Sequence, residues 1–261
     1  MGRLVVSGVS KRFELGKGSV EALRQVGLSL ETGQFGALIG PSGCGKSTLL
    51  RLVADIAAPS EGSITIDGEP PAQCRRDHRI GFVFQDPALL PWRSVLENVR
   101  LPLEVAGKRG VGSGHSPMDL LKLVGLEAFA DARPSQLSGG MQQRAAIARA
   151  LVLAPKLLLL DEPFGALDEI TRHKMNLELL RIWQATGTTA LMVTHSIQEA
   201  VFMADFVFVL AARPGRIVDQ IEVGLPRPRD TVTMNDPAFG ALVSRVRGGL
   251  FGEPAGMLAY G

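Results

Sequence analysis

Apolar residues in this sequence gather in short runs that are separated by polar and glycine-containing turns. Most of the apolar runs have too few polar positions for a solvated face, so we expect them in a buried sheet. Helical patterns alternate with these runs, which predicts an α/β fold with a mainly parallel sheet wrapped by helices. The predicted strands are GSITIDG (62–68), RIGFVFQ (79–85), LLLLDEP (157–163), TTALMVTH (188–195) and FVFVL (206–210).

The strand pattern is interrupted between Gln85 and about Leu153. Helical periodicity replaces it, and the glycine-rich stretch GKRGVGSGHSP (107–117) interrupts that periodicity, so we expect a mainly helical insert. The predicted helices of the insert cover residues 95–105, 118–124 and 141–153. We expect one main domain at 1–225, with a core of 1–85 and 155–225 and an insert at 86–154. A tail at 226–261 should follow, with one short helix near 236–246.

The composition is that of an ordinary globular protein. The 261 residues are 46% hydrophobic and 21% charged, which allows a sizeable core in one large domain or two small ones. The net charge is only +2, so nucleic acid is not an expected partner. Two cysteines are too few for a disulfide scaffold and fit a reducing compartment. No signal-peptide pattern and no membrane-spanning apolar run is found, so we expect a soluble chain.

The stretch GPSGCGKST predicts a phosphate-binding loop. It follows the strand-like FGALI and opens the helical STLLRLVA, which is the context that such a loop requires. Its glycines let backbone amides face phosphate oxygens, Lys46 adds charge at the β and γ positions, and Ser47 can hold Mg²⁺. A purely structural glycine turn is the alternative. The expected nucleotide-binding residues are Gly40, Pro41, Ser42, Gly43, Cys44, Gly45, Lys46, Ser47 and Thr48.

Cys44 lies at the start of the predicted helix. The positive end of a helix dipole favours a thiolate, so we expect a reactive thiol there.

The run LLLLDEP ends in two carboxylates at the expected carboxyl edge of the sheet. Asp161 would orient Mg²⁺ through water and Glu162 would polarise the attacking water. A solvated turn is the alternative for this pair. His195 and Gln85 also end predicted strands, so we expect them at the same edge. His195 is interpreted as either functional or structural, and Gln85 as either a Mg²⁺ ligand or a solvent-facing side chain.

The stretch LSGGMQQR (137–144) offers a second, lysine-free anion site, because a serine and two glycines directly precede a helical run. Together the motifs resemble those of ATP-binding cassette (ABC) proteins. The phosphate loop, Gln85, LSGGMQQR, LLLLDEP, ALD (166–168) and His195 occur in that family's order, and the resemblance covers about residues 4–223. It implies a RecA-like P-loop NTPase core with an N-terminal antiparallel β part and an inserted helical subdomain.

The resemblance also implies an ATPase that uses ATP and Mg²⁺ and closes head to tail with a second copy. Each ATP would then lie between one chain's phosphate loop and Ser138, Gly139 and Gly140 of the other. Phe13 takes the place of the aromatic ring that stacks on adenine, and a core phenylalanine is the alternative. By this resemblance, the catalytic residues are Lys46, Glu162 and His195, and His195 would contact the γ-phosphate. The metal would be held by Ser47, Gln85 and Asp161. Asp168 would be a further nucleotide-binding residue.

Three stretches are similar to the ATPase components of nitrate, sulfonate and taurine importers: QDPALLPWRSVLENV, DEPFGALDEITR and VLAARPGRI. The similarity implies that dimer closure drives uptake of a small anionic solute through a separate permease, with a solute-binding protein acting indirectly. It implies a peripheral location on the cytoplasmic face of the inner membrane. The solute is not fixed, because related sets serve bicarbonate, aromatic acids and pyrimidines. The loop after Gln85 would line the groove for a permease helix and Trp92 would contact it; a tryptophan packed within the insert is the alternative.

Two features depart from the family pattern. Asp55 stands where the family usually has glycine, and aspartate tolerates left-handed backbone, so we expect a tolerated change. The stretch 107–117 replaces a segment that is commonly more helical and charged. Two other functions are alternatives. A soluble ABC ATPase that acts on nucleic acid or the ribosome typically has a coiled-coil insert or two cassettes, whereas this sequence has one cassette and no heptad run. A P-loop kinase has no need of LSGGMQQR.

Overall fold

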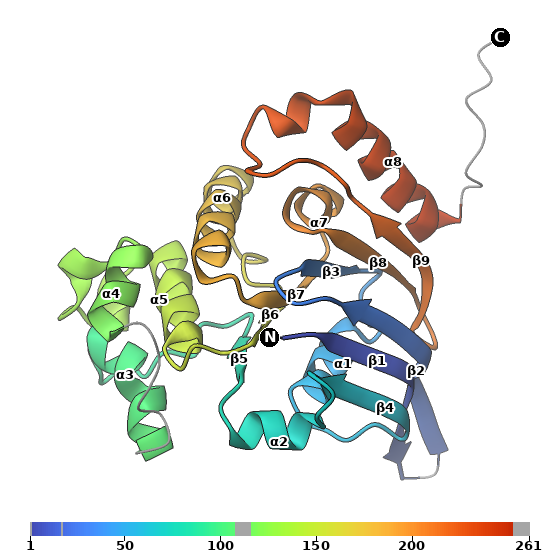
Figure 1. Cartoon of the computed structure of the whole chain (residues 1–261), viewed down its shortest axis with the longest axis horizontal. Coiled ribbons are helices and arrows are strands. Elements are labelled where there is room, and N and C mark those ends of the chain that lie inside the picture. Colours follow the sequence, from blue (N-terminus) through green and yellow to red (C-terminus); the bar gives the residue numbers. More distant parts are fainter. Residues whose placement is uncertain (1, 17, 108–115, 253–261) are drawn as a thin grey trace.

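The fold consists of two β-sheets, the helices that pack on them, and a separate group of helices beside them (Figure 1). The computed structural model describes residues 2–16, 18–107 and 116–252. Most of the glycine-rich stretch 107–117, for which we expect an unusual local structure, lies outside the described residues. Within the described ranges no helix combines the length and apolar character that a membrane span needs.

The larger sheet has six strands in the order β5-β6-β7-β3-β8-β9. Its members are β3 (Phe35–Ile39), β5 (Ile80–Val83), β6 (Leu157–Asp161), β7 (Thr189–Thr194), β8 (Phe206–Ala211) and β9 (Arg216–Glu222). All neighbours pair in parallel except β9, which is antiparallel to β8. The strands β3, β6 and β7 are buried at every position, as the apolar runs predict. The predicted α/β fold with a mainly parallel sheet is confirmed.

The smaller sheet is antiparallel, in the order β2-β1-β4, and consists of β1 (Leu4–Leu15), β2 (Gly18–Leu30) and β4 (Glu61–Ile66). The expectation that GSITIDG joins the buried sheet is wrong, because this run forms β4 at the edge of the smaller sheet. Only Ile64 and Ile66 of β4 are buried, and they alternate with a less buried Thr65. Such alternation is typical of an antiparallel strand with one solvated face.

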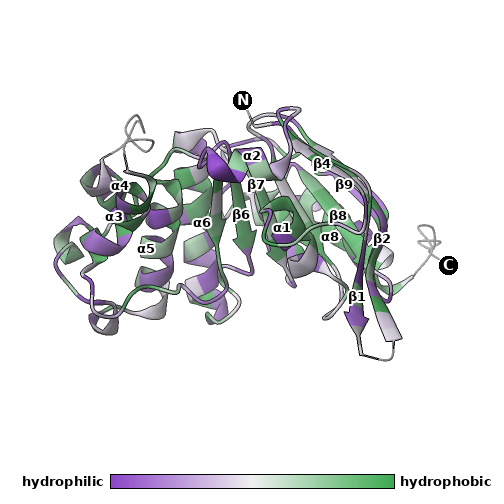
Figure 2. Ribbon diagram, turned by 90° about the horizontal axis from the view of Figure 1, so that it is seen from below, coloured by the Kyte–Doolittle hydropathy of each residue, from purple (hydrophilic) through white to green (hydrophobic). Residues whose placement is uncertain are grey.

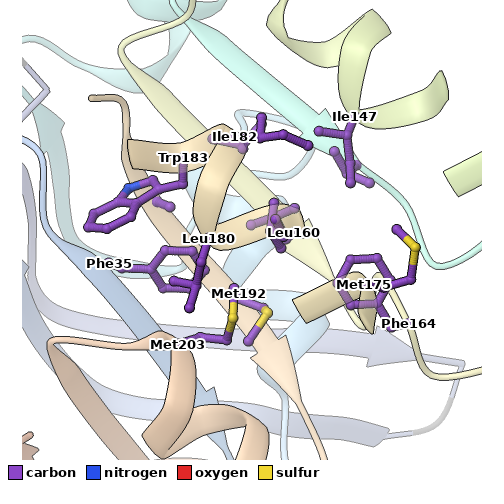
Figure 3. Packing of buried hydrophobic residues seen from close by; sticks show 14 of the residues in the cluster. Phe35, Ile147, Leu160, Phe164, Met175, Leu180, Ile182, Trp183, Met192 and Met203 are labelled. Carbon is purple, nitrogen blue, oxygen red and sulfur yellow. The ribbon is translucent and has the colours of Figure 1, made fainter. Parts of the chain in front are cut away.

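The two faces of the larger sheet are covered by different elements. Helix α1 (Lys46–Val53) packs between the two sheets, where Leu49 and Leu52 join a cluster with Leu38. The opposite face is covered by α6 (Glu169–Thr186), α7 (Ile197–Met203) and α8 (Pro237–Phe251), as Figure 1 shows. Figure 3 shows Phe35 of β3 against Trp183 of α6, with ring centroids 5.5 Å apart in an edge-to-face arrangement.

The helical insert lies between β5 and β6 in the sequence and beside the core in space (Figures 1 and 2). Its helices are α3 (Val95–Ala106), α4 (Pro117–Leu123) and α5 (Gly139–Leu151). The described residues also form α2 (Pro71–Arg76) and 3-10 turns at Glu127–Phe129, Pro134–Gln136 and Thr233–Asn235. The predicted insert is confirmed, and α8 confirms the helix expected near 236–246; the exact domain limits stay a prediction.

Asp55 follows α1 with a φ of 57°, in the left-handed region, as expected from its place in the sequence. Its Oδ2 accepts a hydrogen bond of 2.9 Å from Arg75 Nε. The carboxylate that replaces the family's glycine is therefore paired.

A buried amide holds the loop that joins β5 to the insert. Asn98 of α3 has no solvent exposure. Its Oδ1 accepts from Leu90 N at 2.7 Å, and its Nδ2 donates to Leu90 O at 3.1 Å, Arg93 O at 3.3 Å and Ser94 O at 2.9 Å. One side chain thus satisfies four backbone groups and fixes residues 90–94 against the start of α3.

We predict that Asn98→Ala lowers the free energy of unfolding by about 1–3 kcal/mol, because the Leu90 N–H loses its buried acceptor. Urea unfolding followed by circular dichroism measures this as a lower midpoint with an unchanged slope. The exposed Asn235 provides a control, since Asn235→Ala should change stability by no more than about 0.5 kcal/mol. Equal midpoints for Asn98→Ala and the parent protein would contradict the role of this amide.

Candidate functional site

A cleft of about 460 Å³ lies at the carboxyl edge of the larger sheet. It brings together residues that are far apart in the sequence, because β3, β6 and β7 run parallel and their following loops meet at one edge. The lining residues are Ala22, Ser42, Gly43, Gly45, Lys46, Ser47, Thr48, Glu162 and His195.

The predicted phosphate loop connects β3 to α1. Gly45 has a φ of 98°, and a Cβ there would lie 2.6 Å from Leu23 Cδ2 and 2.9 Å from Ala22 O, so this position requires glycine. Lys46 begins α1, and its Nζ donates to Gly40 O at 2.7 Å and Pro41 O at 3.1 Å. The loop therefore wraps around the lysine ammonium, and both face the cleft.

The thiol of Cys44 points away from the cleft, and the expectation of a reactive thiolate is wrong. Its side chain has no solvent exposure, and a Cβ on Gly40 would lie 2.7 Å from its Sγ. Burial raises the pKa of this thiol, although the nearby Lys46 acts in the opposite direction. Burial disfavours the charged form of a thiol, and here this effect outweighs the helix dipole because the side chain packs into the core beneath the loop.

Asp161 ends β6 directly beside α1. Its Oδ1 accepts a hydrogen bond of 2.8 Å from Ser47 Oγ. Burial raises the pKa of Asp161, and the hydrogen bond from Ser47 opposes this rise. Mg²⁺ in nucleotide sites takes one or two protein ligands, with phosphate oxygens and water completing the octahedron. A serine hydroxyl and a carboxylate that meet at the edge of a phosphate cleft fit that requirement.

Glu162 and His195 come from neighbouring strand ends and face each other across the cleft. Glu162 Oε2 lies 3.4 Å from His195 Nδ1, with both side chains partly exposed. Glu162 has a φ of 45°, which is unusual for a residue with a side chain, and its N–H donates to Val193 O at 3.0 Å. The strand end thus bends sharply at Glu162, so that Asp161 and Glu162 contact different partners.

Gln85 and Phe13 lie outside the lining of the cleft. Gln85 follows β5, the edge strand of the sheet, and is exposed. Phe13 is 42% exposed near the tip of the β1–β2 hairpin, which excludes the core alternative. The Nζ of Lys11 sits 5.0 Å from the centre of the Phe13 ring.

The LSGG and ALD motifs also lie outside the cleft, at the starts of helices. Ser138 caps α5 by accepting from Met141 N at 3.3 Å, and Ser138 and Gly139 are exposed. Asp168 caps α6 by accepting from Thr171 N at 3.0 Å, which lowers the pKa of Asp168. One chain therefore gathers the phosphate loop, Asp161, Glu162 and His195, and its second predicted anion site lies outside the lining of the cleft, with Ser138 and Gly139 exposed.

Ala22 is a lining residue that the sequence did not indicate. It belongs to β2, and its carbonyl accepts a hydrogen bond of 3.0 Å from Gly215 N. An alanine carries no chemical signal, and only the packing of the hairpin against the phosphate loop brings it to the cleft.

Comparison with known proteins agrees with these motifs. Residues 23–165 match the family model described as "ABC transporter". An uncharacterized ABC transporter ATP-binding protein of Methanocaldococcus jannaschii is 46% identical, covering 89% of this chain and 86% of its own length. A nitrate import ATP-binding protein of Synechocystis sp. is 42% identical over 87% of this chain and 85% of its own length. An aliphatic sulfonates import ATP-binding protein of Bacillus cereus is 42% identical over 86% of this chain and 87% of its own length.

A solved structure shares the fold. It is the dimeric structure of a post-hydrolysis state of an ATP-binding cassette bound to ADP and Pi, 35% identical to this chain, with a TM-score of 0.73. The alignment covers 85% of this chain and 100% of that one. The match spans more than half of the chain and the relatives are similar over most of their length, so the chain belongs to the ABC transporter family, as an ATP-binding cassette ATPase.

Proposed function

We propose that this chain is the ATPase subunit of an importer for a small anionic solute and that it drives transport through a separate permease. The nitrate and aliphatic sulfonate relatives support an anionic solute. Association with a permease would hold the chain at the cytoplasmic face of the inner membrane. The observation that carries the proposal is the arrangement of the cleft, which holds the phosphate loop and Glu162, while Ser138 and Gly139 of the LSGG motif are exposed and lie outside its lining.

Within the cleft, the backbone amides of the loop would bind the triphosphate of ATP. The Lys46 ammonium would exchange its contacts with Gly40 O and Pro41 O for oxygens of the β- and γ-phosphates. Ser47 and Asp161, with Gln85 from the neighbouring strand end, would hold Mg²⁺. The metal would supply charge neutralisation on the phosphates.

Hydrolysis would use the pair of side chains opposite the loop. Glu162 would accept a proton from the water that attacks the γ-phosphate in line with the leaving oxygen. His195, 3.4 Å from Glu162, would contact the γ-phosphate and help to stabilise the charge of the transition state. Both side chains line the cleft, which is the geometry that these roles require.

A second copy of the chain would complete the site. Ser138 and Gly139 are exposed at the start of α5, where backbone amides and the helix dipole favour an anion. In a head-to-tail dimer they would reach the γ-phosphate held by the partner. Shifting a dimer from about 1% to 99% closed needs roughly 5.5 kcal/mol of differential binding, which two shared ATP molecules can supply.

A groove of about 430 Å³ between β5 and the insert is the proposed seat of a permease helix. Its walls include Phe82, Phe84, Leu101 and Val105, of which Phe84 and Val105 are exposed. An apolar groove of this kind accepts the apolar face of a short helix. The wall also includes Arg149.

The same groove is tied to the LSGG helix. Arg149 of α5 donates to Ala88 O at 2.8 Å and to Pro87 O at 2.6 Å, and Gln143 of α5 donates to Phe84 O at 3.2 Å. The loop around Gln85 therefore moves with the helix that carries Ser138. These contacts support a mechanical connection between the groove and the shared nucleotide site.

Glu162→Gln should bind ATP but hydrolyse it roughly 10²- to 10⁴-fold more slowly, because an amide cannot accept the proton. The purified variant should therefore elute as a dimer in Mg-ATP and as a monomer without it, measured by size exclusion with light scattering. Lys46→Ala should stay monomeric, since it loses phosphate binding. Parent-like turnover by Glu162→Gln would show that Glu162 is not the base, and a slow variant that stays monomeric in ATP would refute the shared site.

Trp92→Ala should weaken binding to the permease by about 2 kcal/mol, because a large exposed aromatic side chain is a typical interface anchor. Trp92 is 68% exposed, which excludes the alternative that it packs within the insert. Copurification with co-expressed permease measures the loss, and ATP binding should stay unchanged. Neither Trp92 nor Phe129 lines the groove itself. Phe129→Ala, at an aromatic residue of the insert that is 41% exposed and does not belong to the loop after Gln85, is the matched control. Equal copurification by both variants would remove Trp92 from the interface.

A further inference from the structure

The turn that presents His195 to the cleft is held by a buried carboxylate that the proposed hydrolysis does not use. Glu199 lies in the first turn of α7, and only 6% of it is exposed. The helix begins after Ser196, whose Oγ accepts from Glu199 N at 3.3 Å. His195 therefore lies directly before the capped start of the helix that carries Glu199.

The capping arrangement differs from the usual one. In a capping box the glutamate side chain accepts directly from the backbone N–H of the capping serine. Here Ser196 N donates to Thr194 Oγ1 at 3.0 Å, and Thr194 Oγ1 donates in turn to Glu199 Oε2. The Thr194 hydroxyl is thus inserted between the two capping partners. Because Thr194 and Ser196 are the two neighbours of His195, both sides of the histidine are connected to Glu199.

Glu199 also faces α6, on the side where the ALD loop begins. Arg172 and Asn176 of that helix act on the Glu199 carboxylate, Asn176 through its side-chain amide and Arg172 through its charge. Arg172 Nη2 donates to Leu167 O at 2.7 Å, the carbonyl directly before Asp168. The carboxylate therefore lies between the turn around His195 and two side chains of α6, one of which also bonds the carbonyl before Asp168.

This cluster is not built for stability alone. Glu199 Oε1, Asn176 Oδ1 and Arg172 Nε are buried and have no hydrogen-bond partner among the described residues. Buried polar atoms without partners destabilise a fold, and apolar side chains of similar volume often pack at lower free-energy cost. Burial also raises the pKa of Glu199, which shows that the charged form is disfavoured there. What the Glu199 carboxylate does contact is the turn around His195, through the Thr194 hydroxyl that also accepts from Ser196 N.

We propose that Glu199 is a positioning residue for ATP hydrolysis: through the Thr194 hydroxyl it fixes the turn from Thr194 to Ser196 and thereby the direction of His195. The inference rests on the proposed contact between His195 and the γ-phosphate. Glu199 does not touch the substrate, so it acts on the rate of the chemical step and not on the binding of ATP.

The test is steady-state ATP hydrolysis by the purified full chain, with a double-mutant cycle between Glu199 and His195. Glu199→Ala should lower kcat roughly ten- to a hundredfold, because misplacing a catalytic group by about 1 Å costs that much, with KM for ATP little changed. In the His195→Ala background, Glu199→Ala should lower kcat no further. Glu199→Gln should keep most of the activity, since its amide oxygen can still accept from Thr194.

Two further variants separate positioning from folding. Thr194→Val replaces the hydroxyl with a methyl group and changes nothing else in the side chain. It should reproduce the loss of kcat even if Glu199→Ala folds poorly. Arg229→Met is the matched control, because Arg229 is buried and holds the carbonyls of Val201, Phe202 and Ala204 at the other end of α7. It should lower the melting temperature and leave kcat of the folded protein unchanged.

Four outcomes would overturn the inference. If Thr194→Val keeps the parent kcat, or if the effects of Glu199→Ala and His195→Ala on kcat multiply, Glu199 does not act through the histidine, while the proposed role of His195 stands. If Arg229→Met lowers kcat as much as Glu199→Ala, the effect is a general loosening of α7. If His195→Ala itself keeps the parent kcat, the proposed contact with the γ-phosphate fails and the inference fails with it.

Discussion

The parallel pairing of β3, β6 and β7 is the constraint on which the site depends. Because these strands run in one direction and are buried at every position, the residues that follow them must emerge at the same edge. The phosphate loop, the Asp161–Glu162 pair and His195 are those residues. Two clusters of apolar side chains on opposite faces hold this sheet, so the chemistry rests on the most rigid part of the molecule.

The same constraint leaves the LSGG motif elsewhere. It begins a helix of the insert, which is joined to the sheet by the loops after β5 and before β6. A site that is rigid on one side and incomplete on the other is suited to closing around a ligand, because the missing contacts form only when a second surface arrives. In the proposed dimer, the bonds of Arg149 and Gln143 to the loop around Gln85 would connect that closure to the groove beside β5.

The sequence predicted the features that are local. A glycine-rich loop between a strand and a helix, carboxylates at a strand end and a helical insert are each encoded within a few consecutive residues, and the structure confirms their elements. The prediction of which sheet β4 joins was wrong, because a short apolar run does not indicate the strand with which it pairs. The predicted reactivity of the Cys44 thiol was wrong, because the direction of a side chain in a loop depends on tertiary packing. Ala22 and Glu199 carry no motif, and only the hairpin and the turn around His195 show what they contact.

The proposed mechanism requires a nucleotide site that is shared between two copies of the chain. A crystal structure of the protein with Mg²⁺ and a non-hydrolysable ATP analogue tests this most directly. We expect a head-to-tail dimer in which Ser138 Oγ of one chain lies within hydrogen-bond distance, about 2.5–3.0 Å, of a γ-phosphate oxygen held by Lys46 of the other. A structure in which the analogue fills the cleft of a monomer, with Ser138 of every chain still facing solvent, would contradict it.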